Sequence, residues 1–419
     1  MRPDQYHFIN EGVASIVFAC HEGDLNGRVV RIPKQPYHDP ERDDQARQRI
    51  TSIFSALFGH EYILHERLLM IPCDVLRAML SEARRRRAQQ KINLFDVDNI
   101  PETGCWPAWI MDDMTHIGPS SLFTIELKPK WGFLLTSDDY KVHPVQTRIC
   151  RNCIYQCLKH HQGRVQQISH YCPLDLFHND SGRRQRALTN MLETPQNNFV
   201  VFDPDGVCLS DESQRPLANA DLIGLVDAVL SEHVPLLARI QRSQRLTNLT
   251  LPRVHEILQG LTSDEWNEFV ADPLSDEITQ RLTRKAPFTP PSKLQDFPEC
   301  LRDAETFAKT ADGDAPPAPV RPNDVDDVMM VLRLILLEMT ARDVSLMLTF
   351  TSGNEEVPPP SSSDGAPPIR CIEFAGRQWR YKIAVVDLET KYPKKIPHWI
   401  EVDTDMLAHF MELCAKSRS

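Results

Sequence analysis

The stretch from residue 323 to residue 389 places a helix directly before three strand-like runs. In NDVDDVMMVLRLILLEMTARD the apolar residues recur every three or four positions, which predicts a helix with a buried apolar stripe. The runs that follow, VSLMLTF, IRCIEFAG and WRYKIAVVDLE, have the residue types of strands. Because strands that are neighbours in sequence usually pair antiparallel, this stretch predicts an α+β fold.

Two aspartates flank these strands. Asp343 stands at the start of the first run and Asp387 at the end of the third. If those two runs pair antiparallel in one sheet, both acids reach the same edge of that sheet. Such a pair suits phosphoryl transfer, in which one carboxylate holds Mg²⁺ and another orients and deprotonates the attacking hydroxyl. The alternative is that each acid only caps a turn, and these residues alone leave that alternative open.

Residues 124–133, TIELKPKWGF, predict a strand whose two faces differ in character. The two-residue period places Glu126, Lys128 and Lys130 on one face, opposite Ile125 and Leu127. The charged face either binds an anion or is a solvated edge that discourages strand pairing. Further lysines follow the second aspartate and could help to hold a multiply phosphorylated ligand: Lys391, Lys394 and Lys395.

Net charge and composition restrict the classes of partner. The chain of 419 residues carries a formal net charge of −11, so an anionic ligand needs a local basic cluster, and we expect no direct binding of nucleic acid. No apolar run approaches the roughly 18 residues of a membrane span, and the start, MRPDQYHFIN, lacks the features of a signal peptide. We therefore expect a protein of the nucleus or cytoplasm, or both, without a membrane partner. We also expect a monomer.

The first hundred or so residues predict a small α+β unit. SIVFAC and RVVRI have strand character, and SIFSALFGHEYILHERLLM is helix-like. NEGVASIVF puts a glycine and small residues before the first strand, where backbone N–H groups could approach phosphates and Arg31 could bind them. Taken by themselves, these residues favour a simple hairpin over a phosphate loop. The arginines of SEARRRRAQQ are either a nuclear-import signal or the solvated end of a helix.

The middle of the chain predicts scaffold and connections. TRICRNCIYQCLKHHQG and residues 219–247 predict helices, the latter with a break at Pro235. Proline clusters at 286–299, 314–322 and 357–368 predict mobile surface connections, since proline sustains neither helix nor sheet pairing there.

The eleven cysteines are irregularly spaced, unlike a secreted disulfide framework, and we expect them to be reduced. One set could suggest a metal site because it falls in a single predicted helix: Cys150, Cys153, Cys157 and His160. On a continuous helix these residues spread over about three turns, too far to converge on one ion. Packing of the helix is the better interpretation, and we expect no structural zinc.

Seven sequence boxes, taken in order, resemble those of the inositol-pentakisphosphate 2-kinase family. They span residues 11–391 and are EGVAS with VVRIPK, ELKPKWGFL, CRNCIYQCLK, YCPLDLF, TPQNNF, RDVSLMLTF and VVDLETK. The second box is the most specific. The resemblance implies a two-lobed inositol polyphosphate kinase fold, distantly similar to protein kinases. Residues 1–115 would be the nucleotide-binding lobe, and residues 116–419 would carry the inositol phosphate site and the catalytic acids.

The resemblance also implies a reaction and roles for residues. ATP, with Mg²⁺, would phosphorylate the 2-hydroxyl of inositol 1,3,4,5,6-pentakisphosphate to give inositol hexakisphosphate (phytate). Asp343 would be the general base, Lys128 would neutralise the moving phosphoryl group, and Asp387 would bind Mg²⁺. The nucleotide would lie against a phosphate loop, a basic side chain and the connection between the lobes, namely Gly12, Val13, Ala14, Ser15, Arg31, Asp112, Asp113 and Met114. The inositol phosphates would lie in a largely basic cage of Lys91, Lys128, Lys130, Arg151, Lys159, Asn197, Asn198, Lys391, Lys395 and Trp399.

Departures from the family pattern leave the substrate open. Val200 and Lys395 stand where plant members carry arginine, and Trp399 stands where they carry tyrosine. Plant members of the family hold a zinc through a Cys/His insertion. This sequence, although it resembles them in the seven boxes, has no matching insertion. The alternatives are a kinase for another inositol phosphate and a catalytically silent inositol-phosphate-binding adaptor. A protein kinase is disfavoured because no H-R-D or D-F-G box occurs.

Overall fold

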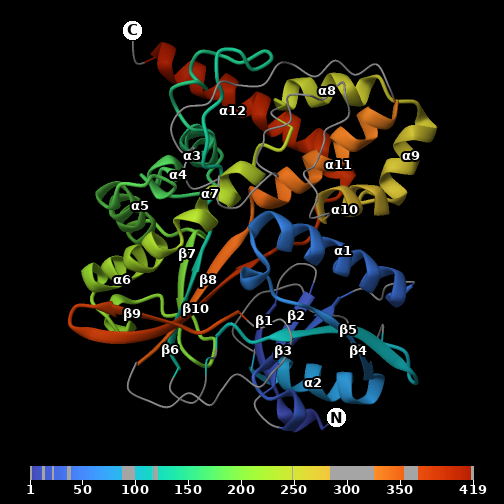
Figure 1. Cartoon of the computed structure of the whole chain (residues 1–419), viewed down its shortest axis with the longest axis vertical. Helices are drawn as coiled ribbons and strands as arrows, with labels where there is room; N and C mark the ends of the chain where they lie inside the picture. The colour runs from blue at the N-terminus through green and yellow to red at the C-terminus, as the bar shows by residue number, and fades with distance from the viewer. Residues whose placement is uncertain are drawn as a thin grey trace.

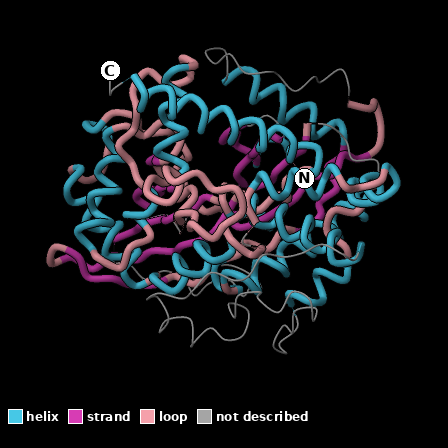
Figure 2. The backbone as a smooth tube through the Cα atoms, turned by 90° about the horizontal axis from the view of Figure 1, so that it is seen from above, coloured by secondary structure: helices cyan, strands magenta, loops and turns pink. Residues whose placement is uncertain are grey.

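The computed structural model describes residues 2–11, 15–20, 23–34, 39–86, 100–115, 117, 121–247, 249–283, 325–352 and 367–416. Within these residues lie two five-stranded antiparallel sheets and the helices that pack on them. Seen from above in Figure 2, the strands run through the interior and helices lie around them. The predicted α+β class is therefore confirmed.

The N-terminal sheet has the strand order β1-β2-β3-β5-β4 and contains both strands that were predicted near the start of the chain. One of its faces packs on α2 (Cys73–Arg86), and Phe18, Leu76 and Trp106 belong to the shared hydrophobic cluster. In Figure 1, α2 lies below this sheet and α1 (Pro40–Phe58) lies above it. The strands are β1 (Tyr6–Glu11), β2 (Ser15–Cys20), β3 (Arg28–Pro33), β4 (Arg67–Pro72) and β5 (Cys105–Asp112).

The helix-like interpretation of residues 52–70 is wrong in its second half. Helix α1 (Pro40–Phe58) ends at Gly59, whose φ of 107° is a backbone conformation that favours glycine. The chain then continues through a short 3₁₀ turn into β4. The apolar residues on either side of Gly59 thus belong to two different elements.

Helix α1 connects the N-terminal sheet to the rest of the molecule. Its apolar residues Ile53, Phe54 and Phe58 are fully buried in the larger hydrophobic cluster, which is centred on the other sheet. The same helix also contacts the N-terminal sheet. The guanidinium of Arg47 lies 4.1 Å from the ring centroid of Trp109 in β5. Such a helix fixes one sheet relative to the other.

The C-terminal sheet has the order β7-β6-β8-β10-β9. Strands β8 (Ser345–Ser352) and β10 (Arg377–Val386) pair antiparallel, with Val386 opposite Ser345. This confirms the predicted pairing of the first and third strand-like runs and brings the flanking aspartates to one edge. The remaining strands are β6 (Ser121–Leu127), β7 (Phe199–Phe202) and β9 (Arg370–Phe374).

Helix α11 (Val325–Ala341) is buried more completely than an apolar stripe predicts. Every side chain from Met329 to Ala341 is buried, and these include Arg333 and Glu338. Glu338 Oε2 lies 2.9 Å from Arg342 Nη2, so the buried carboxylate of Glu338 is paired. The helix therefore lies in the core, and its end delivers Asp343 to the sheet edge.

The other helices surround this core. The predicted break near Pro235 is confirmed, since α6 ends before His233 and α7 begins directly after it. The helices are α3 (Arg151–His161), α4 (Pro173–Leu176), α5 (Ser181–Glu193), α6 (Asn219–Glu232), α7 (Val234–Ser243), α8 (Leu251–Gln259), α9 (Ser263–Ala271), α10 (Asp276–Thr283) and α12 (Ile396–Lys416). Short 3₁₀ helices are η1 (Pro3–Gln5), η2 (Gly23–Leu25), η3 (His60–Tyr62), η5 (Glu212–Gln214) and η8 (Pro393–Lys395).

Some predictions fall outside the described residues. They concern the proline clusters at 286–299 and 314–322 and most of the cluster at 357–368. Of the arginine run, Arg84 lies exposed near the end of α2, and Arg87 is not among the described residues. Within the described part of the chain, no helix is both long and apolar enough to cross a membrane.

Candidate functional site

The Lys-Pro-Lys segment begins where β6 ends. The strand was predicted to continue to residue 133, but it stops at Leu127, two residues before a proline that cannot donate a ladder hydrogen bond. Lys128 N still donates to Asn198 O at 2.8 Å, and Lys130 has a φ of 59°. Ile125 and Leu127 are buried, as their predicted face requires. The two lysines thus lie in an irregular segment that leaves the sheet edge.

Lys128 faces the aspartate that follows β10. Its Nζ lies 2.7 Å from Asp387 Oδ2 and 3.5 Å from Glu126 Oε1. Ser345 Oγ donates to Asp387 Oδ2, or to Glu126 Oε1, at 2.8 Å in each case. Asp387 itself has a φ of 64°, a conformation that is uncommon for a residue other than glycine. Three segments of the chain therefore meet at one carboxylate.

The second aspartate pairs with two further lysines. Asp343 Oδ1 lies 3.5 Å from Lys130 Nζ, and Asp343 Oδ2 lies 2.7 Å from Lys391 Nζ. Among the described residues, the carboxylates of Asp343 and Asp387 accept hydrogen bonds only from side chains. Turn caps look different here, since Asp203 after β7 accepts from the backbone N–H groups of Asp205 and Val207. The geometry therefore does not support the alternative that Asp343 and Asp387 only cap turns.

The neighbouring charges set the protonation of this cluster. Partial burial favours the neutral acids, but the adjacent lysines outweigh it and hold the pKa of Asp343 and the pKa of Asp387 below their usual values. Burial likewise opposes the charge on Lys128, yet Asp387 raises the pKa of that lysine. Burial lowers the pKa of Lys130 in spite of Asp343. Both aspartates are therefore anions at neutral pH.

The Lys-Pro-Lys backbone is held from both sides by residues to which the sequence had assigned no role. Tyr171 Oη donates to Pro129 O at 2.6 Å, and Gln244 Nε2 donates to Lys130 O at 2.7 Å. Gln244 Oε1 also accepts from Gly132 N at 2.8 Å. Tyr171 lies in the YCPLDLF box, which could have pointed to it, whereas no sequence signal marks Gln244.

Lys159 extends the basic cluster from α3. Its Nζ donates to Gln196 Oε1 at 3.0 Å. Burial, followed by the positive charges of Lys130 and Arg164, lowers the pKa of Lys159 to about 8. Lys159 and Lys130 are therefore close enough to repel each other, as expected of side chains that face one anion site.

The two predicted asparagines differ in their surroundings. Asn197 is exposed, whereas Asn198 is buried and its backbone pairs with Lys128. Among the described residues no partner is recorded for Asn198 Oδ1, a buried oxygen atom. A buried polar atom without a partner is costly, so this amide suits a ligand that would complete it.

Arg31, in β3, links the N-terminal sheet to the segment that carries Asp387. Its Nε donates to Ser15 Oγ at 3.0 Å, and its Nη2 lies 2.7 Å from Glu389 Oε1, two residues after Asp387. Arg47 Nη2 lies 3.6 Å from the same glutamate oxygen. Glu389 is a residue that sequence reasoning missed, although it stands in the VVDLETK box.

The end of β5 and the residues directly after it make contacts with other parts of the chain. Asp112 pairs with Arg28 at 2.5 Å, and Asp113 Oδ1 accepts from Thr115 N at 2.7 Å. The carbonyl of Met114 accepts from Thr124 Oγ1 at 3.3 Å. These residues lie between the strands of the N-terminal sheet and those of the C-terminal sheet along the chain, while their contact with a nucleotide stays a prediction.

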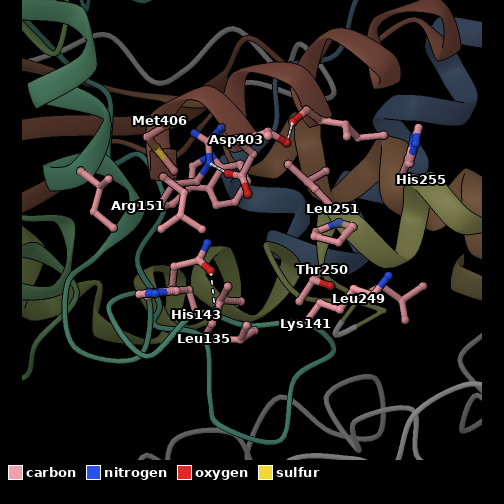
Figure 3. A pocket seen from close by; sticks show the side chains of 18 of the residues that line it. Leu135, Lys141, His143, Arg151, Leu249, Thr250, Leu251, His255, Asp403 and Met406 are labelled. Carbon is pink, nitrogen blue, oxygen red and sulfur yellow. Dashed lines mark hydrogen bonds and ion pairs between the residues drawn. The ribbon is translucent and has the colours of Figure 1, made fainter. Parts of the chain in front are cut away.

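Arg151 is one of the residues that line a cavity of about 550 Å³. Its Nε donates to Asp403 Oδ1 at 2.8 Å, and its guanidinium lies 4.1 Å from the ring centroid of Trp131. Figure 3 shows Arg151 and Asp403 together on one wall of this cavity, opposite His143. Of the predicted substrate residues that the structure describes, only Arg151 lines the cavity, and the lysines of the cluster do not.

Other predicted site residues stand apart or were not described. Lys395 is exposed in η8, where its Nζ lies 5.9 Å from the ring centroid of Tyr392. Trp399 packs at the edge of a hydrophobic cluster with Met339 and Ile396. The predicted residues that lie outside the described ones are Gly12, Val13, Ala14 and Lys91.

Comparison with known proteins gives consistent relatives. The family model described as Inositol-pentakisphosphate 2-kinase matches residues 8–405. A Danio rerio protein of that name is 27% identical over 236 residues, which cover 52% of this chain and 48% of that protein. An Oryza sativa subsp. indica relative is 24% identical over 93% of this chain and 82% of its own length. An Arabidopsis thaliana relative is 21% identical over 88% of this chain and 78% of its own length.

Proposed function

The chain belongs to the inositol-pentakisphosphate 2-kinase family and is thus a transferase, and we propose that it uses ATP to phosphorylate the 2-hydroxyl of inositol 1,3,4,5,6-pentakisphosphate. The product would be inositol hexakisphosphate. In this proposal residues 1–115 form a nucleotide-binding lobe and residues 116–419 form the lobe that carries the substrate site.

One observation carries the proposal. Three lysines from two distant segments, Lys128, Lys130 and Lys391, lie within 3.5 Å of two aspartates that flank a pair of neighbouring strands. Cations are needed because a pentakisphosphate and ATP repel each other strongly. Anionic oxygens are needed as well, to activate a hydroxyl and to bind a metal. A binding adaptor would require only the cations.

Asp343 is assigned as the general base. It is ionised at neutral pH, so it can accept a proton, and two lysines hold its carboxylate in place. A substrate that draws Lys130 and Lys391 onto its phosphates would free this carboxylate to face the hydroxyl. Lys128, between the sites assigned to base and metal, is placed to offset charge on the moving phosphoryl group.

The residues around Asp387 suit Mg²⁺. The side-chain oxygens of Asp387, Ser345 and Glu126 lie together, and oxygen ligands are those that Mg²⁺ prefers. A bound Mg²⁺ would neutralise charge on the nucleotide phosphates. Arg31 and Ser15 would contact those phosphates from the N-terminal sheet.

A second candidate is a kinase for another inositol phosphate. Arg151 is engaged by Asp403, and Lys395 stands exposed beside Tyr392, so two predicted cage cations do not join the lysine cluster. Fewer cations would suit a substrate with fewer phosphates. The adaptor has less support, since a binder needs no pair of ionised aspartates.

The test is a phosphorylation assay with positional analysis. Purified protein, ATP and Mg²⁺ are incubated separately with the pentakisphosphate and with inositol phosphates that carry fewer phosphates. We expect hexakisphosphate from the first incubation at the highest kcat/KM. Preference for a less phosphorylated substrate would favour the second candidate, and no phosphate transfer to any of them would refute kinase activity.

Replacement of the base separates catalysis from binding. Asp343→Asn should lower kcat by about a hundredfold or more, the scale of general-base removal, while pentakisphosphate binding by calorimetry persists. The matched control is Asp203→Asn, which changes another aspartate that directly follows a strand but caps a turn. Wild-type turnover in Asp343→Asn would assign the base elsewhere.

A further inference from the structure

A buried guanidinium lies directly beside the group assigned as general base. Arg342 follows α11 and precedes Asp343, and its side chain is 5% exposed. Its Nη2 pairs with Glu338 Oε2 at 2.9 Å. Burial lowers the pKa of Arg342 to about 10, so the group is still a cation at neutral pH. Desolvation offsets most of the attraction in a buried ion pair, so the pair alone does not explain why a guanidinium lies here.

The same guanidinium reaches the segment that carries Lys130. Its Nε donates to Gln244 O at 2.8 Å, and its Cζ lies 4.1 Å from the ring centroid of Trp131, the residue after Lys130. The Nε2 of Gln244 donates to Lys130 O at 2.7 Å and lies 3.3 Å from Ala341 O at the end of α11. Two segments that are distant in the sequence are therefore joined around one buried side chain.

We propose that Arg342 is a positioning residue that holds Asp343 and Lys130 in one arrangement. The carboxylate and the ammonium lie 3.5 Å apart, between Oδ1 and Nζ. Arg342 is joined to the aspartate by the chain itself, and to the lysine segment through Gln244 and Trp131. The inference rests on the proposed function, because it concerns the assigned base and a cation assigned to the substrate.

Arginine suits this position better than lysine does. A guanidinium donates in several fixed directions and stacks on aromatic rings, whereas an ammonium is a compact point charge. Here Nη2, Nε and Nη1 meet Glu338 Oε2, Gln244 O and Met339 Sδ at 2.9, 2.8 and 3.1 Å. A lysine would keep the charge beside Glu338 but could not make all of these contacts. Arg342→Lys thus separates the positioning from the charge.

The alternative is that Arg342 only stabilises the fold, and Arg184 supplies the matched control. Arg184 is 2% exposed, and its Nε donates to Asp227 Oδ1 at 2.7 Å between α5 and α6. Its Nη1 donates to the carbonyls of His178 and Asn179, directly before α5. Arg184→Lys should therefore disturb an equally buried ion pair without changing the site.

Steady-state kinetics test the link to the base. Arg342→Lys should lower kcat about tenfold to a hundredfold, because a small displacement of a reacting group has effects of this size, and Arg184→Lys should keep the wild-type kcat. In an Asp343→Asn background, Arg342→Lys should lower kcat by no more than about threefold, since no base is left to position. The same loss in both backgrounds, or an equal loss in Arg184→Lys, would overturn the role.

Binding tests the link to Lys130 without any phosphate transfer. The Kd of the pentakisphosphate, measured by calorimetry, should rise about threefold to tenfold in Arg342→Lys and in Gln244→Leu, the scale of one or two lost hydrogen bonds. Gln244→Leu leaves the guanidinium and its ion pair in place, so it also serves if Arg342→Lys does not fold. In a Lys130→Met background neither substitution should raise Kd by more than about twofold. A wild-type Kd in both variants, or the full rise in that background, would contradict the inference.

Hydrogen exchange tests the positioning with no ligand present. Gly132 N donates to Gln244 Oε1 at 2.8 Å, so protection of this amide reports how firmly the lysine segment is held. Its exchange should be at least about fivefold faster in Arg342→Lys and unchanged in Arg184→Lys, with the amides of β8 as a measure of global unfolding. Normal protection of Gly132 in Arg342→Lys would refute the positioning role, whereas a wild type that transfers no phosphate would refute the proposed function.

Discussion

At the scale of the residue, Lys159 is a side chain whose charge depends on pH close to neutrality. Its pKa is lowered to about 8, first by burial and then by Lys130 and Arg164. A lysine is cationic below its pKa, so this positive charge is lost as pH rises through 8. The affinity of the free protein for a polyanion should fall over the same range.

This effect predicts a pH profile. In the wild type, kcat/KM for the inositol phosphate should fall by up to about tenfold per pH unit above pH 8, because kcat/KM reports ionisations of the free enzyme. Lys159→Arg should largely remove that limb, since arginine stays charged. Lys141→Arg is the control, because Lys141 pairs with Glu256 and lies outside the lysine cluster. An unchanged profile in Lys159→Arg would assign the ionisation to another group.

At the scale of the element, Gly132 fixes how the Lys-Pro-Lys segment meets α4. A Cβ atom there would overlap the ring of Phe177. Gly132→Ala should therefore displace the segment or the short helix, lowering the free energy of unfolding by about 1–3 kcal/mol. Because Lys130 lies two residues away, kcat/KM should fall as well. Both quantities are measured, the first by urea unfolding.

Gly182→Ala supplies the comparison. At that position the nearest atom to a new Cβ is Asp180 Oδ1 at 3.3 Å, a much looser contact than the overlap with the ring of Phe177. Its stability and activity should remain close to those of the wild type. Equal behaviour of the two variants would show that the contact with Phe177 does not determine the position of the segment.

A histidine at the junction of α6 and α7 should make the stability of the fold depend on pH. His233 lies between the hydroxyls of Tyr62, at 2.9 Å, and Tyr381, at 3.1 Å. Burial, with Arg370, lowers the pKa of His233 to about 4 from its ordinary 6.5. The unfolded chain therefore binds a proton more readily between these values, and stability is lost as pH falls below 6.5.

Urea unfolding at several pH values tests this junction. The free energy of unfolding should fall by at most roughly 1.4 kcal/mol per pH unit over that window. His233→Gln should be less stable at pH 7, because the tyrosine contacts change, but its dependence on pH should be shallower. A slope identical to that of the wild type would contradict the assignment to His233.

Sequence patterns predicted elements well where one physical cause dominated. The strands around Asp343 and Asp387 and their antiparallel pairing followed from residue type and order. Residues 52–70 were misjudged because their apolar period continues across Gly59, and only the backbone shows that the helix ends there. The Lys-Pro-Lys strand was drawn too long because its end depends on the proline and on Gln244, which is distant in sequence.

The same limit applies to the candidate site. Lys128, Lys130, Asp343, Asp387 and Lys391 come together as the sequence boxes predicted. Partners such as Glu389 and Gln244 could not be predicted, because their contacts depend on three-dimensional packing between segments.

At the scale of the whole molecule, the ion pair of Arg31 with Glu389 links the N-terminal sheet to the sheet edge that carries Asp387. If Arg31 binds nucleotide phosphates, ATP must compete with this carboxylate. Glu389→Gln should then lower the KM for ATP about twofold to fivefold, the scale of a partly exposed ion pair.

Steady-state kinetics at fixed inositol phosphate would measure this change. The control is Glu256→Gln, whose carboxylate pairs with Lys141 on another part of the surface. A raised KM for ATP in Glu389→Gln would indicate instead that Glu389 assists nucleotide binding.

The charges at the sheet edge balance one another before any ligand arrives, since Glu126, Asp343 and Asp387 face Lys128, Lys130 and Lys391. A polyanion that binds the lysines would leave the carboxylates without cationic partners, and a divalent cation would then compensate their negative charge. Binding of the polyanion would thus favour binding of the cation, and by reciprocity the affinity for each ligand would rise when the other is bound. Such a resting neutrality would make the protein respond to the coincidence of sugar phosphate and metal nucleotide, and only weakly to either alone.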